Sequence, residues 1–401
     1  MAAVAEVEGT ETPASFRSRV RTWLDQHAPR KGEPGDFSAA HLISAQTPGE
    51  YERRERDALA VTKQWQRRLF DAGLAGLSWP RAYGGTEGPT WLDEIVAEEQ
   101  TRYGVSTKML AIALEMVPPV LFGFGTDEQR ARHLPDVLRG EESWCQLLSE
   151  PGAGSDLAGV ATRASAVAGG WEVTGQKVWT SGAGTADFAL LLARTEPEPG
   201  RGGLSCLILD MRAPGIEVRP LRQMSGGYHF NEVFLSAAFV PEAGLIGERG
   251  GGWAVLRTML ASVRAAIGGG TSGRSAVQLV ALAQRLGRTD DAVVRQVVAA
   301  ACARERVLDL LQARVMATPV PAGGSLTKLL YSEHARRSAD DAMGILGATG
   351  MTSEHPDAAP WVERLLFAPG LRIGGGTDEV QRNTIAERGL GLPREPAPPR
   401  S

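Results

Sequence analysis

The chain has 401 residues, with 43 Lys and Arg against 47 Asp and Glu, and 43% of its residues are hydrophobic. Such a chain can build a large core in two or three domains, which excludes disorder as the dominant state. The formal net charge of -4 and the scattered basic residues give no basic face for nucleic acid. The N-terminus lacks a signal-peptide pattern, and no stretch approaches the roughly 20 apolar residues that span a bilayer. We therefore expect a cytoplasmic protein with neither nucleic acid nor membrane as a partner.

The first third of the chain has the pattern of a helical domain. Apolar residues recur at helical spacing over 52–72, and Gly73 ends that segment. A second helix is predicted over 127–138, before Gly140. The apolar stretch between them contains Pro118–Pro119, where we expect a turn. These segments predict an N-terminal α-helical domain over residues 1–140.

Strand patterns begin at Trp171, and helical spacing returns near residue 250. Five short runs rich in β-branched and aromatic residues are separated by Gly and Pro clusters: WEVTGQKVW, FALLLART, LSCLILDM, IEVRPL and NEVFLSAAFV. Helices are predicted over 253–267 and 291–316, and further helices continue to about Leu390. We therefore predict a middle β domain over 141–246, a C-terminal helical domain over 247–392 and a disordered Pro-rich tail over 393–401.

The cysteines and histidines do not suggest a metal site. Cys145, Cys206 and Cys302 form no C-x-x-C pair, so we expect three buried apolar residues and no disulfide framework. The six histidines never fall at metal-ligand spacing. We predict that the protein uses no metal ion.

Three polar, glycine-rich segments are candidates for ligand binding. SEPGAGSDLAG (149–159) combines glycines with hydroxyls, although its spacing is not that of a dinucleotide fingerprint and alone favours a tight turn. KVWTSGAG places Trp179 beside two hydroxyls at the end of a strand, where an indole is more often simply core. GGGTDE (374–379) precedes an amphipathic helix and suits either an anion site or an ordinary helix cap.

Taken together and in this order, these segments resemble the acyl-CoA dehydrogenase family. The matching pieces also include LAGLSWPRAYGG (74–85), DEQRARHLPDVLRGEESWCQLLSEPGAGSD (127–156) and FNEVFLSAAFVPEAGLIGERGGGW (230–253), and they cover nearly the whole chain. The WCQ–SEPGAGSD form is similar to the branch common in actinomycetes, whose members often act on steroid-derived or otherwise bulky acyl-CoA thioesters. The resemblance implies an α+β multidomain fold, with an N-terminal α-helical domain, a middle β-barrel-like domain and a C-terminal four-helix bundle.

The same resemblance implies the ligands of the protein and its site residues. The cofactor would be FAD, the substrate an acyl-CoA or acyl-carrier thioester and the electron acceptor an electron-transfer flavoprotein, in a homo- or hetero-oligomer. Trp179 would pack on the flavin, with hydroxyls near its N5 edge. The implied cofactor contacts are Gln146, Leu148, Ser149, Gly154, Ser155, Trp179, Thr180, Ser181, Thr377 and Glu379, and the implied substrate contacts are Ser155, Arg264 and Gly375.

The sequence departs from the family at the catalytic base. Dehydrogenation needs a carboxylate to remove the α-proton of the thioester, and the two positions that usually hold this Glu are Gly375 and Val263 here. Glu115 is a candidate replacement, because it is the only charged residue between Lys108 and Asp127. The alternative interpretation is an ordinary exposed Glu at a helix end before Pro118.

Three functions are therefore open from the sequence. The first is α,β-dehydrogenation of an acyl thioester with an unidentified base. The second is a non-catalytic subunit that completes the FAD site of a related catalytic chain. The third is a repurposed flavin-dependent monooxygenase or oxidase, which needs no α-proton base.

Overall fold

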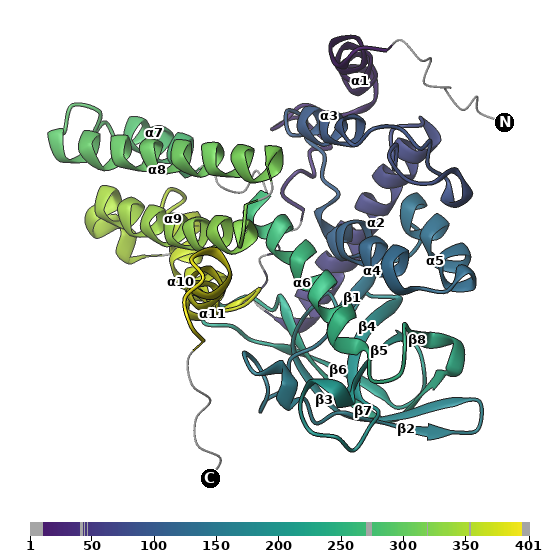
Figure 1. Cartoon of the computed structure of the whole chain (residues 1–401). Helices are drawn as coiled ribbons and strands as arrows, with labels where there is room; N and C mark the ends of the chain where they lie inside the picture. The colour runs from purple at the N-terminus through teal and green to yellow at the C-terminus, as the bar shows by residue number, and fades with distance from the viewer. Residues whose placement is uncertain are drawn as a thin grey trace. The chain divides into compact units, whose positions relative to one another are not determined.

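Helices come first and last in the chain, and the strands lie between them (Figure 1). This computed structural model describes residues 11–40, 43, 45, 47–269, 275–318, 320–352 and 354–394, without the side chains of 263–269. Residues 395–401 of the predicted tail lie outside the described part. The chain forms two units, Met1–Met259 and Leu260–Ser401. The predicted fold class, with helical, β and helical regions in that order, is confirmed.

Three helices of the first unit begin at a threonine cap, and the first two of its helices share an apolar core. They are α1 (Pro13–His27), α2 (Pro48–Asp71), α3 (Trp91–Gln100), α4 (Val117–Phe124) and α5 (Asp127–Arg139). Thr12 and Thr126 each close a capping box, and the side chain of Thr47 caps α2. Phe16, Val20 and Leu24 lie at helical spacing on α1 and are fully buried against the core that contains Trp65 and Leu69 of α2.

The turn expected at Pro118–Pro119 is wrong. Both prolines lie in the first turn of α4, where a missing N–H costs nothing and the fixed φ angle of proline suits a helix. The segment before them contains a 3-10 turn, Lys108–Leu110, and then a π-helical turn, Ile112–Met116. The π-helical turn therefore leads directly into α4, and the chain does not break at the prolines.

The first unit also contains an eight-stranded sheet. Its strands are β1 (Trp144–Leu147), β2 (Arg163–Val167), β3 (Gly170–Ser181), β4 (Phe188–Arg194), β5 (Leu204–Asp210), β6 (Ile216–Leu221), β7 (Phe230–Pro241) and β8 (Leu245–Ile246). Their order is β6-β7-β3-β2-β4-β5-β8, and β1 pairs parallel with β4. The five predicted strands are present as β3 to β7, whereas β1, β2 and β8 were not predicted.

The second unit is a helical bundle. It comprises the end of α6 (Gly252–Gly269), α7 (Ser275–Arg285), α8 (Ala292–Ala317), α9 (Gly323–Leu346), α10 (Ala359–Ile373) and α11 (Asp378–Thr384). Leu279, Leu282, Ile345 and Trp361 belong to its buried core. The boundary between the two units falls within α6, and α7 is a helix that the sequence pattern did not single out.

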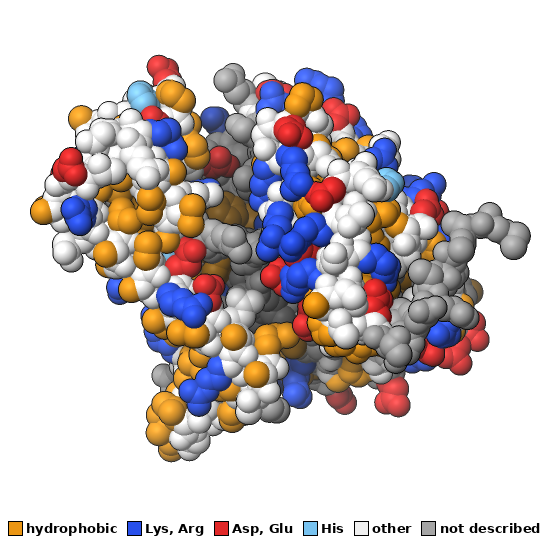
Figure 2. Space-filling model, turned by 90° about the horizontal axis from the view of Figure 1, so that it is seen from above, with side chains coloured by type: hydrophobic (Ala, Val, Ile, Leu, Met, Phe, Trp, Pro, Cys, Tyr) orange, Lys and Arg blue, Asp and Glu red, His pale blue; other side chains and the backbone are white. Residues whose placement is uncertain are grey.

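The surface carries charges of both signs. Figure 2 shows Lys and Arg side chains interspersed with Asp and Glu side chains. Some of these opposite charges form surface ion pairs, such as Arg17 with Glu98. No helix in the described ranges has the length and apolar content needed to cross a membrane. Cys145 and Cys206 are buried as expected, but Cys302 is exposed on α8, so the prediction of three buried cysteines is wrong for that residue.

Candidate functional site

Trp179 occupies a strained bulge on β3. Lys177 pairs with Val233 of β7 and Thr180 pairs with Asn231, so β3 has one residue more than β7 between the two pairs. The extra length is taken up by Trp179, whose φ angle of 62° is in the left-handed region that bulky residues rarely adopt. Its side chain is 60% exposed, although its ring meets Phe230 edge-on at 5.9 Å. Trp179 is therefore not a core residue, as the alternative interpretation would have it, but a strained and exposed aromatic side chain, which is a common feature of ligand sites.

The two hydroxyls after Trp179 differ in burial. Thr180 is 1% exposed, and its Oγ1 has no hydrogen-bond partner among the described residues. Its carbonyl accepts a hydrogen bond of 3.1 Å from Asn231 Nδ2, which fixes the residue in place. Ser181 is exposed. A buried unpaired hydroxyl costs about 1–3 kcal/mol, so Thr180 fits a site in which a ligand supplies the missing partner.

The glycine-rich segment lies against this bulge. The Val178 N–H donates to the Ser149 carbonyl at 2.9 Å, which places Ser149 beside the residue that precedes Trp179. A Cβ atom built on Gly152 or Gly154 would meet no atom within 4 Å, and neither glycine has a positive φ angle. Among the residues that the structure describes, nothing requires glycine at these two positions. Together with exposed Ser155, they leave open space that a close-lying ligand would use.

A buried ion pair that the sequence analysis missed holds this segment to β3. Lys177 Nζ donates to Glu150 Oε1 at 2.8 Å and to the Leu148 carbonyl at 3.0 Å. Burial lowers the pKa of Lys177 to about 8, against the opposing effect of Glu150. Burial raises the pKa of Glu150, but the Lys177 charge and hydrogen bonds from Lys177, Thr162 and Ala161 together bring it below its usual value. A sequence signal existed, since Lys177 lies at an inward position of β3, where the other buried residues carry no charge.

Glu115 lies in the π-helical turn Ile112–Met116, a form of turn that often occurs at functional sites. The turn contacts β1, because Gln146 Nε2 donates to the Met116 sulfur at 2.7 Å. Glu115 is exposed to solvent, but desolvation by neighbouring atoms raises the pKa of its carboxyl. The charge of Lys108 opposes this shift and is the smaller effect. The turn that contains Glu115 therefore contacts Gln146, which is one of the predicted cofactor contacts.

A second titratable cluster surrounds Glu55 on α2. The Tyr51 hydroxyl donates to Glu55 Oε1 at 3.4 Å and lies 3.4 Å from His229 Nδ1. Glu55 is 4% exposed, and burial raises its pKa to about 7. Its Oε2 would lie 3.8 Å from a Cβ atom on Gly184, in the turn that follows Ser181. Sequence reasoning missed this Glu, because neighbouring charges such as Glu52 and Arg56 hide it among surface residues.

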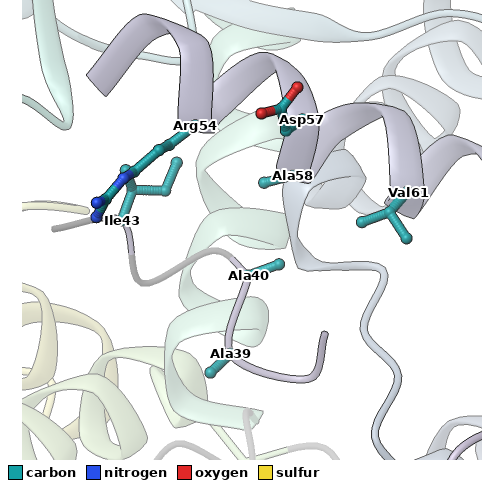
Figure 3. A pocket seen from close by; sticks show the side chains of 7 residues that line it. All are labelled: Ala39, Ala40, Ile43, Arg54, Asp57, Ala58 and Val61. Carbon is teal, nitrogen blue, oxygen red and sulfur yellow. The ribbon is translucent and has the colours of Figure 1, made fainter. Parts of the chain in front are cut away.

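A cavity of about 330 Å³ lies beside the same helix (Figure 3). Arg54, Asp57, Ala58 and Val61 line it from α2, and Ala39, Ala40 and Ile43 line it from the preceding segment. None of the predicted cofactor contacts lies in this lining. Among the residues with described positions, no group of three or more His, Cys, Asp and Glu could hold a metal ion.

The third glycine-rich segment forms an anchored turn in the second unit. Gly375 and Gly376 have φ angles of 68° and 89°, and Gln381 Nε2 donates to both of their carbonyls, at 2.9 and 3.2 Å. The Thr377 side chain accepts from the Val380 N–H at 3.2 Å and therefore caps α11, as the helix-cap interpretation predicts. Glu379 is exposed and pairs with Arg382 at 3.4 Å.

Asp378, which follows this turn in the chain, anchors it through buried hydrogen bonds. Its Oδ1 accepts from Lys328 Nζ at 2.9 Å and from the Ser332 hydroxyl at 2.8 Å, and its Oδ2 accepts from Arg372 Nε at 2.7 Å. Lys328 is fully buried. The glycine turn is thus held by a buried polar network.

The predicted site residues separate into two groups. Gln146, Leu148, Ser149, Gly154, Ser155, Trp179, Thr180 and Ser181 lie together where β1 and the following turn meet the end of β3. Gly375, Thr377 and Glu379 form the turn in the second unit. Val263 and Arg264 lie on α6, and their side chains are outside the described part of the chain.

Comparison with known proteins agrees with this architecture. Models of the N-terminal, middle and C-terminal domains of acyl-CoA dehydrogenase match residues 37–141, 145–236 and 250–390. The chain belongs to the acyl-CoA dehydrogenase family. Members of this family are flavoproteins that use FAD.

Several relatives are similar to this chain along nearly their whole length. Acyl-CoA dehydrogenase IpdE1 of Mycobacterium tuberculosis is 37% identical over 390 residues, which are 95% of this chain and 98% of IpdE1. The solved Tcur3481-Tcur3483 steroid ACAD has a TM-score of 0.79 and 28% identity, covering 96% of this chain and 99% of that one. The ChsE4-ChsE5 complex from Mycobacterium tuberculosis has a TM-score of 0.73 and 29% identity, covering 97% and 100%.

Proposed function

We propose that this chain binds FAD and takes part in the α,β-dehydrogenation of an acyl-CoA thioester. The observation that carries this proposal is the bulge on β3, where exposed Trp179 lies beside the buried, unpaired hydroxyl of Thr180. A flat ring system can stack on the indole, and a ring heteroatom can accept the Thr180 hydrogen bond. FAD, when bound, supplies the acceptor for the β-hydride. The residues of this chain bind and orient the ligands and handle the α-proton.

The direct test of cofactor binding uses the isolated chain. Apoprotein is titrated with FAD, and the dissociation constant is compared between the parent and a Thr180→Val variant. Loss of one hydrogen bond worth about 1–1.5 kcal/mol predicts affinity about tenfold weaker. Ser165→Ala, an exposed hydroxyl on β2, serves as the matched control and should bind as the parent does. Equal affinity of parent and Thr180→Val would remove Thr180 from the site.

Glu115 is the proposed base of this reaction. Neither Gly375 nor Val263 offers a carboxylate, whereas Glu115 lies in the π-helical turn whose last residue, Met116, contacts Gln146 of β1. Desolvation raises its pKa, which makes the carboxylate a better proton acceptor than an ordinary surface Glu. Because a base acts in its ionised form, the rate of flavin reduction should rise with pH through this raised pKa.

The role of Glu115 is tested by single-turnover reduction with a reactive thioester. A positioned base contributes roughly 10²–10⁴ in rate, so Glu115→Gln should slow flavin reduction by that factor while FAD stays bound. Glu172→Gln, at an exposed position of β3, is the matched control and should leave the rate unchanged. An unaltered rate for Glu115→Gln would show that another group removes the proton.

The proposed substrate class is a bulky, steroid-derived acyl-CoA. The solved relative at 28% identity is named a steroid ACAD, and the similarity covers 96% of this chain. Competition between a steroid side-chain thioester and a straight-chain thioester would test this choice. Preference for the straight chain would contradict it.

A specific observation also supports a second candidate, a subunit that completes the FAD site of a related chain. Gly375 has no carboxylate, and its turn is nevertheless anchored by Gln381 and Asp378. Solved relatives are named as pairs, Tcur3481-Tcur3483 and ChsE4-ChsE5. This candidate predicts weak FAD retention by the isolated chain and recovery on co-expression with a related chain. Full retention by an isolated homo-oligomer would exclude it.

A further inference from the structure

Lys177 forms hydrogen bonds to the residues immediately before and after Ser149. Its ammonium donates to the carbonyl of Leu148 at 3.0 Å and to the carboxylate of Glu150 at 2.8 Å, and these residues flank Ser149 in the chain. The Lys177 side chain is 0% exposed and that of Glu150 is 8% exposed. Bonds to a buried ion of this kind are strongly directional and expensive to break.

Glu150 extends the same connection to β2. Its Oε2 accepts from the Ala161 N–H at 2.7 Å, and its Oε1 accepts from the Thr162 N–H at 2.9 Å, just before β2 begins at Arg163. The pair therefore ties three segments together: the glycine-rich turn, the start of β2 and the middle of β3.

A second anchor lies three residues further along β3. The Thr180 carbonyl accepts from Asn231 Nδ2 at 3.1 Å, and Thr180 pairs with Asn231 in the ladder. Between the anchored Lys177 and the anchored Thr180, β3 has one residue too many for β7. The extra residue must leave the ladder, and Trp179 does so with a left-handed φ angle and an exposed ring.

We propose that Lys177 and Glu150 are positioning residues of the cofactor site, whose ion pair holds β3 in the bulged register that exposes Trp179 and buries the Thr180 hydroxyl. The inference rests on the proposed FAD function. Without the pair, β3 can relieve the strain at Trp179 by returning to a regular ladder. A shift of one residue exchanges the faces of neighbouring side chains, so Thr180 would turn outward.

The register is measured by thiol labelling, which needs no cofactor. A cysteine is introduced by Thr180→Cys in a Cys302→Ser background, because Cys302 is exposed while Cys145 and Cys206 are buried. The test variant is Lys177→Met with Glu150→Gln, which removes both charges and leaves no unpaired buried ion. We expect labelling of the folded protein at position 180 to be faster than in the parent by on the order of 10²-fold, because protection by burial is lost.

Two comparisons separate positioning from a general loss of stability. Lys63→Met breaks a half-buried pair with Asp187 elsewhere in the same unit and should leave the labelling rate at position 180 unchanged. In the Thr180 parent, Lys177→Met with Glu150→Gln should weaken FAD binding at least tenfold and change the visible spectrum of bound flavin. Thermal unfolding followed by circular dichroism verifies that each variant is folded.

The outcomes decide the two proposals separately. Unchanged labelling in the folded double variant would overturn the register claim. Faster labelling with unchanged FAD affinity and spectrum would overturn the positioning role. A parent protein that binds no FAD would overturn the proposed function, and the labelling rates would still decide the register.

Discussion

Glu55 makes the stability of the first unit depend on pH. Its carboxyl is buried, and its pKa in the folded protein is about 7, compared with an ordinary value of 4.5. The folded state therefore binds the proton more tightly than the unfolded state does. Stability from this group is fully present below pH 4.5 and is lost as pH rises through 7. Replacement by Gln, which is neutral at every pH, removes this dependence.

The size of the effect follows from the two pKa values. Between pH 5 and pH 8, the free energy of unfolding should fall by about 2.5 kcal/mol more in the parent than in Glu55→Gln. The assay is urea unfolding of both proteins at each pH. Contributions from the other titrating groups cancel in the difference between the two free energies of unfolding. Asp71→Asn, at an exposed position at the end of the same helix, is the control, and it should follow the parent.

Two results would refute this reasoning. If the difference in unfolding free energy between parent and Glu55→Gln is the same at pH 5 and pH 8, Glu55 has an ordinary pKa. If the parent becomes more stable than the variant as pH rises, the carboxylate is stabilised in its ionised form and the assigned cause, burial, is wrong.

Three further predictions concern the two glycine-rich regions. Trp179→Gly removes the strain of a left-handed conformation, which costs about 1–2 kcal/mol, so the free energy of unfolding should stay level or rise while FAD affinity falls. A clear loss of stability would contradict strain at this position. Lys328→Met leaves Asp378 short of one buried cation and should lower the stability of the second unit by about 3–5 kcal/mol, as measured by urea unfolding, and a loss under 1 kcal/mol would show that Arg372 suffices. Gly376→Ala brings a Cβ atom to 2.5 Å from Gln381 Nε2 at a φ angle of 89°, so thermal unfolding of the second unit should occur at lower temperature than in Gly344→Ala, whose site is open.

Periodicity was sufficient for the long elements and failed for the short ones. The helix predicted over 291–316 is Ala292–Ala317, and the five strand-like runs are β3 to β7. Strand β1 has only four residues, and β2 carries mostly small or exposed residues, so neither shows an extended alternation. Their place in the sheet is set by pairing with β4 and β3, which are distant in sequence.

The candidate site was predictable by position but not by geometry. The motif matches identified Trp179 and Thr180, yet the bulge depends on how β3 pairs with β7. The ion pair between Glu150 and Lys177 joins residues 27 apart in the chain, so the inward charge of Lys177 was visible on its strand but its partner was not. Glu55 is similar, because burial by packing is the main cause of its raised pKa and the charge of nearby Glu52 adds to it.

Dehydrogenation of an acyl thioester is tested by anaerobic addition of acyl-CoA thioesters to the purified, FAD-containing protein, alone and together with a related chain. The panel should contain short, long, branched and steroid-derived acyl groups, and the visible absorbance of the flavin is followed. We expect a steroid-derived thioester to bleach the bound flavin and Glu115→Gln to slow this step. A flavin-replete protein that no thioester bleaches, in either form, would contradict this expectation.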